Sequence, residues 1–138
     1  MVITKHVQVD TKGNTDVIDI TSKCHDILGS AGIKNGTITI FNPGSTGGLT
    51  TLEYEPNLVL DLRNALELLA PRDKVYEHSK TWCDDNGSSH VRSSLMGPSI
   101  TVPFENGKLT LGTWQQIVFC DFDTRPRRRS LVVQVIGE

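Results

Sequence analysis

The stretch of this sequence best equipped for chemistry is Tyr76 to His90, YEHSKTWCDDNGSSH. It contains two of the four histidines, His78 and His90, with the carboxylates of Asp84 and Asp85 between them. Imidazole and carboxylate groups are the usual protein ligands of zinc and of similar divalent ions. The separation of the two histidines matches no short zinc signature. Two interpretations therefore stay open: a metal site, or two surface histidines in a polar loop.

Two local features favour a site in this stretch. The tetrapeptide Asp84-Asp85-Asn86-Gly87 is a tight-turn sequence, so the chain can fold back and bring His78 towards His90. His90 also lies at the expected start of a short helix, where free backbone N–H groups favour an anion. A metal ion and a phosphate group can therefore meet at this place.

A second candidate is the glycine-rich loop NPGSTGG, residues 42–48. Its glycines let the backbone approach a ligand closely, and Ser45 and Thr46 offer hydroxyl groups. The loop matches neither the P-loop nor the dinucleotide-binding pattern. Glu53 and Glu55 follow it on one face of an expected strand, either as a carboxylate pair or as a solvated stripe.

The segment TRPRRR contributes four arginines, Arg125, Arg127, Arg128 and Arg129. Strand alternation places Arg128 on the face opposite Arg127 and Arg129. We expect Arg128 to face a pocket and to hold an anion through two parallel hydrogen bonds, with its neighbours solvated. Nucleic acid is the alternative partner. The net charge of −2 and the lack of a second basic cluster argue against it.

Trp114 and Gln115 lie in the segment LGTWQQI. A tryptophan in a strand usually packs in a core or an interface. A buried amide needs hydrogen-bond partners, which packing alone does not explain. Gln115 is therefore a candidate for contact with a polar ligand.

The elements that must position these residues follow from the hydrophobic periodicity. Helices are expected in residues 17–32, 55–71 and 88–98, where capping residues, Pro56 and terminal glycines mark the ends. Strands are expected in residues 2–9, 36–42, 49–55 and 130–137, and residues 99–123 are expected to form a hairpin that turns at Asn106-Gly107. The predicted fold is one α+β domain, residues 1–138. Its sheet is mainly antiparallel and barrel-like, with two main helices and a short third helix on it.

Composition excludes several classes of protein. The chain has 138 residues, of which 37% are hydrophobic and 22% charged, as in an ordinary globular domain. No apolar run is long enough to cross a membrane and the first residues lack a signal-peptide core, so a cytoplasmic location is expected. Three cysteines without a C-x-x-C spacing predict buried or inert thiols rather than a disulfide framework. The aromatic content of 6% argues against a base-stacking surface.

Residues 76–123, followed by RPRRRSLVVQVIGE, closely resemble the YjbQ family, which is named for a secondary thiamine-phosphate synthase activity. The family pattern has Tyr-x-His, an acidic turn, and a Ser/Ala-His that starts a helix ending in Leu-x-Gly. Leu-x-x-Gly-Thr-Trp-Gln and an arginine-rich entry to a final strand ending in Gly-Glu follow. All these parts are present, and the resemblance covers nearly the whole chain.

The resemblance implies a homotrimer with a divalent metal, Zn or Mg, near the paired histidines. It also implies a low-level ability to join a pyrimidine diphosphate to a thiazole phosphate, giving thiamine phosphate and pyrophosphate. Many bacterial members carry a histidine where this chain has Gly44, and Glu53 matches the glutamate that follows the loop. The expected metal ligands are therefore His78 and His90, with Asp85 or Glu53 as the third.

Two functions remain in view. The first is a metal-assisted synthase, in which the phosphates are held by polar groups along the chain: Ser45, Thr46, Ser89, Gln115 and Arg128. The second is a trimeric protein that binds a metal or a small anion without significant catalysis. The sequence offers no obvious acid–base pair, which keeps the second function open. In both cases a phosphorylated small molecule is the expected partner, and neither nucleic acid nor a membrane is.

Overall fold

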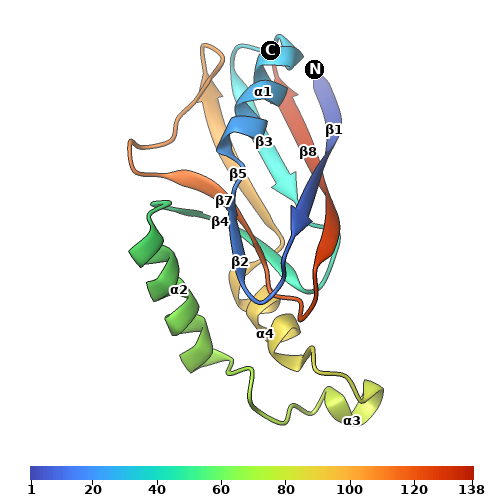
Figure 1. The fold of residues 1–138 in the computed structure, drawn as a ribbon. Coiled ribbons are helices and arrows are strands. Elements are labelled where there is room, and N and C mark those ends of the chain that lie inside the picture. The colour runs from blue at the N-terminus through green and yellow to red at the C-terminus, as the bar shows by residue number, and fades with distance from the viewer.

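The computed structural model describes residues 1–138 and contains two antiparallel sheets (Figure 1). The larger sheet has five strands in the order β1-β8-β3-β5-β6. Their bounds are β1 (Val2–Thr11), β8 (Arg127–Gly137), β3 (Gly36–Phe41), β5 (Ser99–Glu105) and β6 (Lys108–Leu109). The smaller sheet has the order β2-β7-β4, with bounds β2 (Asp16–Asp19), β7 (Gln116–Asp121) and β4 (Gly47–Leu52).

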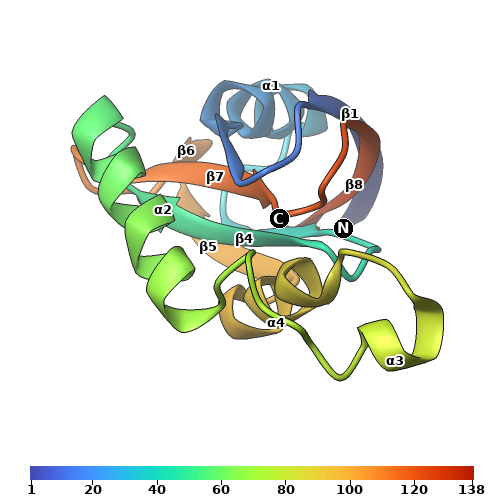
Figure 2. The ribbon, with the colours of Figure 1, turned by 60° about the horizontal axis from the view of Figure 1, so that its bottom comes forward.

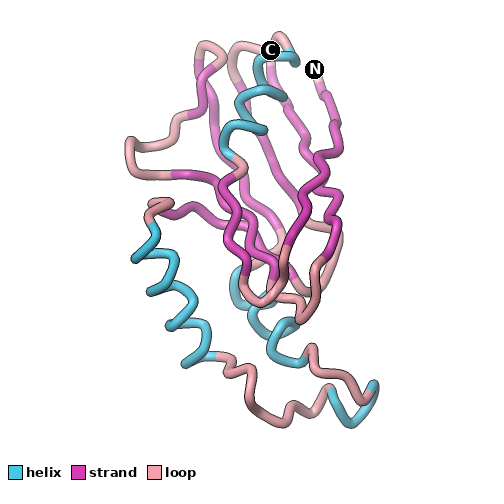
Figure 3. Tube along the Cα trace, in the orientation of Figure 1, coloured by secondary structure: helices cyan, strands magenta, loops and turns pink.

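The sheets curl into a half-barrel, as the tube in Figure 3 shows, so the predicted α+β class with a mainly antiparallel, barrel-like sheet is confirmed. Three longer helices accompany the sheets: α1 (Thr21–Ala31), α2 (Pro56–Leu69) and α4 (Gly87–Met96). A fourth helix of one turn, α3 (Ser79–Trp82), lies inside the stretch that begins at Tyr76 and was not predicted. None of these helices is both long and apolar enough to span a membrane.

Local sequence explains where the main helices begin and end. The carboxylate of Glu55 accepts hydrogen bonds from the N–H groups of Asn57 and Leu58, and Pro56 occupies the first position of α2. Gly32 ends α1 in the left-handed conformation, with φ of 68°. Pro56 and Gly32 thus lie where the sequence predicted them, whereas the Glu55 cap was not predicted and α4 begins without the expected serine cap.

Two hydrophobic clusters form the core. The larger one fills the space between the two sheets and beneath α1, and the smaller one lies between α2 and the outer face of the smaller sheet. Strand β7 serves both clusters because its side chains alternate: Ile117 and Phe119 face the larger cluster, Val118 and Cys120 the smaller one. Figure 2 shows α1 and α4 on opposite sides of the curled sheets, with α2 at one end.

The predicted hairpin is correct at its turn and wrong in its length. Asn106 and Gly107 have φ of 51° and 73°, as a two-residue turn requires, but only two residues of β6 pair with β5. The chain then leaves the larger sheet and enters the smaller one as β7, between β2 and β4. Alternation is the same in either sheet, so the local pattern did not reveal this change of sheet.

Candidate functional site

The two predicted histidines lie side by side. Their ring centroids are 4.6 Å apart with an interplanar angle of 58°, and both residues are half-buried. His78 precedes α3 and His90 lies in the first turn of α4. The acidic turn between the two helices folds the chain back, as its sequence predicted, and Asp84 places a carboxylate oxygen 3.5 Å from Nε2 of His78.

The histidine pair lines a cavity of about 340 Å³, which we call the histidine cavity. Its walls come from the segment before α3 and from the first turns of α4: Lys74, Val75, Tyr76, Glu77, His78, Gly87, His90 and Val91. The start of α4 has no side-chain cap, because Asn86 makes no capping hydrogen bond, and its first turn has no acidic residue. The positive end of the helix dipole therefore lies at a cavity bearing two imidazoles, one lysine and Glu77, whose carboxylate pairs with Lys80.

The two expected third ligands are not beside the histidines. Asp85 accepts a hydrogen bond from the hydroxyl of Thr124 at 3.1 Å, and Glu53 lines a different cavity with Trp114. No three histidine, cysteine or carboxylate side chains of the chain approach closely enough to hold a metal ion. The carboxylate beside the pair is that of Asp84, since the turn directs Asp85 towards the loop after β7.

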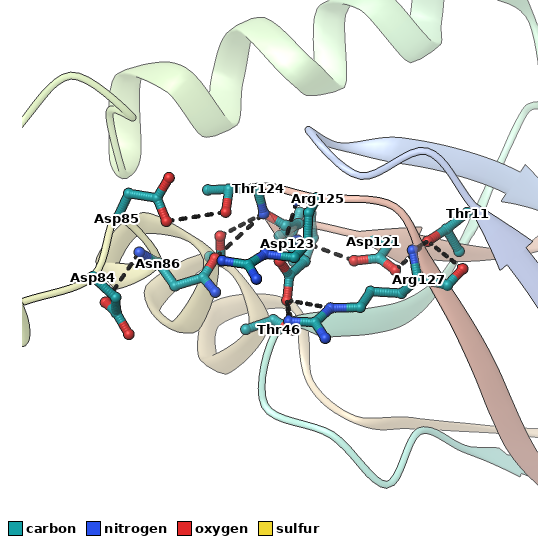
Figure 4. A network of polar contacts seen from close by, with 12 residues as sticks. Thr11, Thr46, Asp84, Asp85, Asn86, Asp121, Asp123, Thr124, Arg125 and Arg127 are labelled. Atoms are coloured by element: carbon teal, nitrogen blue, oxygen red, sulfur yellow. Dashed lines mark hydrogen bonds and ion pairs between the residues drawn. The ribbon is translucent and has the colours of Figure 1, made fainter. Parts of the chain in front are cut away.

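A polar cluster lies where β7 ends and β8 begins (Figure 4). Arg129 donates from Nε and Nη2 to both carboxylate oxygens of Asp121, at 2.8 and 2.9 Å, and Asp121 is fully buried. Arg127 donates from Nε to Asp123 at 3.1 Å. Two threonine hydroxyls complete this Asp121–Arg129 cluster, whose members are Thr11, Thr46, Asp121, Asp123, Arg127 and Arg129.

The prediction that Arg128 faces a pocket is wrong. Its side chain is 74% exposed and lies 3.7 Å from the exposed carboxylate of Asp10. The side chain of Arg129 is 14% exposed and points into the cluster, whereas solvation had been predicted for it. Alternation does separate Arg128 from its neighbours, but it cannot say which face of β8 is turned inward.

The other predicted ligands are dispersed. Thr46 belongs to the cluster, because its hydroxyl accepts from Arg129 and donates to Asp123, whereas Ser45 next to it is exposed. The Ser89 hydroxyl donates to the carbonyl of Phe122 and is fully buried. The amide of Gln115, which is exposed rather than buried, accepts from Gly112 N–H and donates to the Thr51 hydroxyl. None of these side chains lines the histidine cavity.

Gly44, where many bacterial members of the resembled family have histidine, lies beside the same cluster. A Cβ at this position would be 3.3 Å from Nη1 of Arg129 and 3.5 Å from the amide of Asn42. A larger side chain at position 44 would therefore meet the cluster. The lack of a histidine here removes nothing from the His78–His90 pair itself.

Two groups of functional residues were not predicted from the sequence: Lys74 and Tyr76, which line the cavity, and Asp121 and Asp123, which pair with the arginines. The signal for the second pair was available. Two acidic residues in the otherwise apolar FCDFD precede the arginine run by a few positions, and carboxylates are almost never fully buried unless paired.

The first prediction concerns the stability of the fold at low pH. Burial raises the pKa of Asp123, but hydrogen bonds from Arg125 N–H and from Arg127 outweigh burial and hold the pKa below its ordinary value of 3.8. A carboxyl whose pKa is lowered by folding contributes stability above its unfolded pKa and loses it as the pH falls through the folded pKa. The free energy of unfolding should therefore fall between about pH 5 and pH 2.

Urea unfolding of the parent and of Asp123→Asn over this pH range checks the prediction. The variant should be less stable at neutral pH and should show a shallower fall in acid. Asp10→Asn is the matched control, because Asp10 is 84% exposed. Parallel pH curves for the parent and Asp123→Asn would contradict the assignment.

The curled antiparallel sheet, with a histidine pair set at the start of a helix, defines a small α+β protein with one histidine-lined pocket. The chain belongs to the family described as UPF0047 protein YjbQ-like, whose model matches residues 5–138. A UPF0047 protein of Methanothermobacter thermautotrophicus is 39% identical over 137 residues, covering 99% of this chain and 94% of the relative. YugU of Bacillus subtilis is 35% identical over 135 residues, covering 96% and 98%.

Solved structures agree with this assignment. A protein from Sulfolobus solfataricus, described as YbjQ-like and of unknown function, superposes with a TM-score of 0.94 at 29% identity and covers 100% of this chain and 99% of that one. A YjbQ/UPF0047 family protein from Clostridium acetobutylicum gives 0.87 at 33% identity, covering 96% and 99%. The family and its fold are thereby shown.

Proposed function

We propose that this protein binds a phosphorylated small molecule in the histidine cavity. We further propose that it there joins, at a low rate, a pyrimidine diphosphate to a thiazole phosphate, giving thiamine phosphate and pyrophosphate. The observation that carries the proposal is the meeting of His78 and His90 with the uncapped start of α4 in one cavity. The cavity suits an anion, and the reaction itself rests on the likeness to the YjbQ family.

The anion-binding part of the proposal follows from the chain's own groups. Gly87 lines the cavity at the first position of α4, where N–H groups have no partner within the helix. A phosphate accepts hydrogen bonds from such groups and is favoured by the helix dipole. Lys74 adds a positive charge at the rim, where its ammonium lies 5.3 Å from the centre of the Tyr76 ring.

A divalent metal bound at this place would have only part of its ligands from the protein. Two adjacent imidazoles are suitable ligands, but no third protein ligand accompanies them, so water or phosphate oxygens would complete the shell. When bound, the ion would neutralise negative charge on the diphosphate. His78 and His90 are the ligands we propose, and Asp84 is placed to accept a hydrogen bond from His78 and orient its ring.

The coupling needs no nucleophile from the protein. The bond between the pyrimidine-bearing carbon and the diphosphate oxygen breaks, and pyrophosphate leaves with the electron pair. The thiazole nitrogen then donates its lone pair to that carbon. The protein's part is to hold both phosphates and keep the two reactants adjacent, which accelerates a bimolecular step.

The second prediction tests metal and turnover together. His78→Ala and His90→Ala should each lose bound metal and product formation, because the remaining imidazole alone binds a divalent ion weakly. Elemental analysis and a thiamine-phosphate assay with both substrates are the measurements. His25→Ala is the control, since His25 is exposed on α1, at the opposite end of the fold from α3 (Figure 1). Unchanged metal in the His78/His90 double variant would place the metal elsewhere.

The alternative function is binding without significant catalysis. It is favoured by one observation: only two histidines, and no group of three metal ligands, are present at the cavity. Pyrophosphate titration distinguishes the two functions. Saturable binding that His90→Ala removes, with no product from the paired substrates, would establish a binding protein.

We also propose that the chain forms a homotrimer, and the outer face of the larger sheet supports self-association. Three rows of paired residues cross β1, β8, β3 and β5 there, none of them buried. The rows contain no aspartate, glutamate, lysine or arginine: Val2, Ile136, Thr37, Pro103; Thr4, Gln134, Thr39, Thr101; His6, Val132, Phe41, Ser99. Copies can meet on such a face without repulsion between like charges.

The third prediction is that sedimentation equilibrium at micromolar concentration finds a trimer. Thr39→Glu, at the centre of the uncharged face, should dissociate it, because a buried carboxylate without a partner is costly. Ser94→Glu, on the exposed side of α4, should leave the trimer intact. A stable parent monomer would refute the prediction, and an intact trimer in Thr39→Glu would place the interface on another face.

A further inference from the structure

A second cavity, of about 390 Å³, shares no residue with the histidine cavity. It lies where β2 and β4 end and β7 begins, near the start of α2. We call it the Trp114 cavity. Its lining residues are Asp19, Glu53, Tyr54, Glu55, Thr113, Trp114 and Gln116.

The charged side chains that line the Trp114 cavity are all acidic. Three of its lining residues are acidic, none is basic, and neither Asp19, Glu53 nor Glu55 takes part in an ion pair. Asp19 and Glu55 accept hydrogen bonds from backbone N–H groups, whereas the Glu53 carboxylate has no hydrogen-bond partner in the chain. The cavity therefore has acidic side chains and no basic one, and Glu53 is the carboxylate that no other group of the chain engages.

Two aromatic side chains accompany these carboxylates. Trp114 is 72% exposed and Tyr54 is 47% exposed. Tyr54 is held in place, because its hydroxyl donates to the carbonyl of Val17 at 3.0 Å and its N–H donates to Gln116 at 2.9 Å. The π face of an indole or phenol ring attracts a cation, and tryptophan does so most strongly.

These properties select a class of ligand. An anion is repelled, and a neutral apolar ligand would leave the Glu53 carboxylate without a partner. A bare metal ion is excluded by geometry, since no three carboxylates approach closely enough to hold one. An alkylammonium group suits both the carboxylates and the aromatic rings that line the cavity, because both stabilise a positive charge.

We propose that the Trp114 cavity binds an organic ammonium cation, held between the Trp114 and Tyr54 rings and the carboxylate of Glu53. The group belongs either to a free amine or to a lysine side chain of a peptide. This site is independent of the proposed synthase activity, because the two cavities have no residue in common.

Tryptophan fluorescence tests the proposal directly. In a Trp82→Phe background, where Trp114 is the one remaining tryptophan, choline should change the emission in a saturable way. The neutral carbon isostere of choline should not, because the charge provides the attraction. Spermidine and a lysine-containing tripeptide then show which kind of molecule carries the ammonium group. Tighter binding of spermidine identifies a free amine as the ligand, and tighter binding of the tripeptide identifies a lysine side chain.

Variants locate the site. Glu53→Gln should weaken choline binding by about three- to tenfold. Trp114→Leu, followed by calorimetry in the parent background, should weaken it by a similar factor of about three to ten. Glu77→Gln is the control, because Glu77 pairs with Lys80 near the other cavity. Equal binding of choline and its neutral isostere, or unchanged affinity in Glu53→Gln, would overturn the proposal.

Discussion

Arg129→Ala should lower the free energy of unfolding by about 3–5 kcal/mol, the usual cost of removing one partner of a buried ion pair. Arg129 donates two parallel hydrogen bonds to Asp121, at 2.8 and 2.9 Å. Asp121 has no exposed surface, so its carboxylate would be left buried and uncompensated. Thr46 would lose its contact with Arg129 as well, which loosens the glycine-rich loop.

Arg128→Ala is the matched control for this prediction. The neighbouring side chain is 74% exposed, and its pairing distance to Asp10 is 3.7 Å, so its removal should change stability by no more than about 0.5 kcal/mol. Guanidinium denaturation of both variants is the measurement. Equal losses would mean that the guanidinium of Arg129 does not compensate Asp121.

A double replacement separates the ion pair from the packing around it. Arg129→Met combined with Asp121→Asn removes both charges and keeps most of the volume. It should recover part of the loss, because a neutral pair carries no uncompensated charge. A double variant as unstable as Arg129→Ala would contradict the electrostatic explanation and favour a packing one.

Arg92→Met should cost about 2–4 kcal/mol, because a buried polar group left without a partner costs about 1–3 kcal/mol. Arg92, on α4, is 2% exposed and donates from Nε and Nη2 to the carbonyl of Ala70, at 3.0 and 2.9 Å. It also donates from Nη1 to the hydroxyl of Thr15 at 2.8 Å, and Ala70 and Thr15 are themselves buried. Methionine fills much of the space but donates nothing.

This arginine also joins two helices, because Ala70 is the C-terminal cap of α2. A cation at that end of the helix is favoured by the dipole. The segment leading to His78 begins immediately after Ala70, so Arg92→Met should also loosen the histidine cavity. Faster amide exchange in residues 71–78 would show that effect.

Glu67→Gln provides the comparison for Arg92. Glu67 accepts from Nη2 of Arg92 at 2.6 Å, but its side chain is 51% exposed. Its replacement should cost at most about 1 kcal/mol, as for other solvent-exposed pairs. A loss in Glu67→Gln as large as in Arg92→Met would assign the stability to the ion pair rather than to Ala70 and Thr15.

Much of the fold could be predicted from local sequence because local forces determine it. The hydrophobic periodicity of residues 55–71, with Pro56 near its start, predicted α2, and Asn106-Gly107 predicted the tight turn after β5. The acidic turn before Gly87 predicted that His78 and His90 approach one another, which their 4.6 Å ring separation confirms. In each case the residues that decide the conformation lie within a few positions of one another.

The tertiary structure alone decided which side chains share a site. Alternation separates Arg128 from Arg129, but burial of Asp121 against β8 determines that Arg129 faces inward. Asp85 turns towards Thr124, 39 residues away in the sequence, and Glu53 lies beside Trp114 in another cavity. A two-residue period carries no information about which face is buried or which distant strand is adjacent. The packing of the two sheets determines both the buried face and the neighbouring strand.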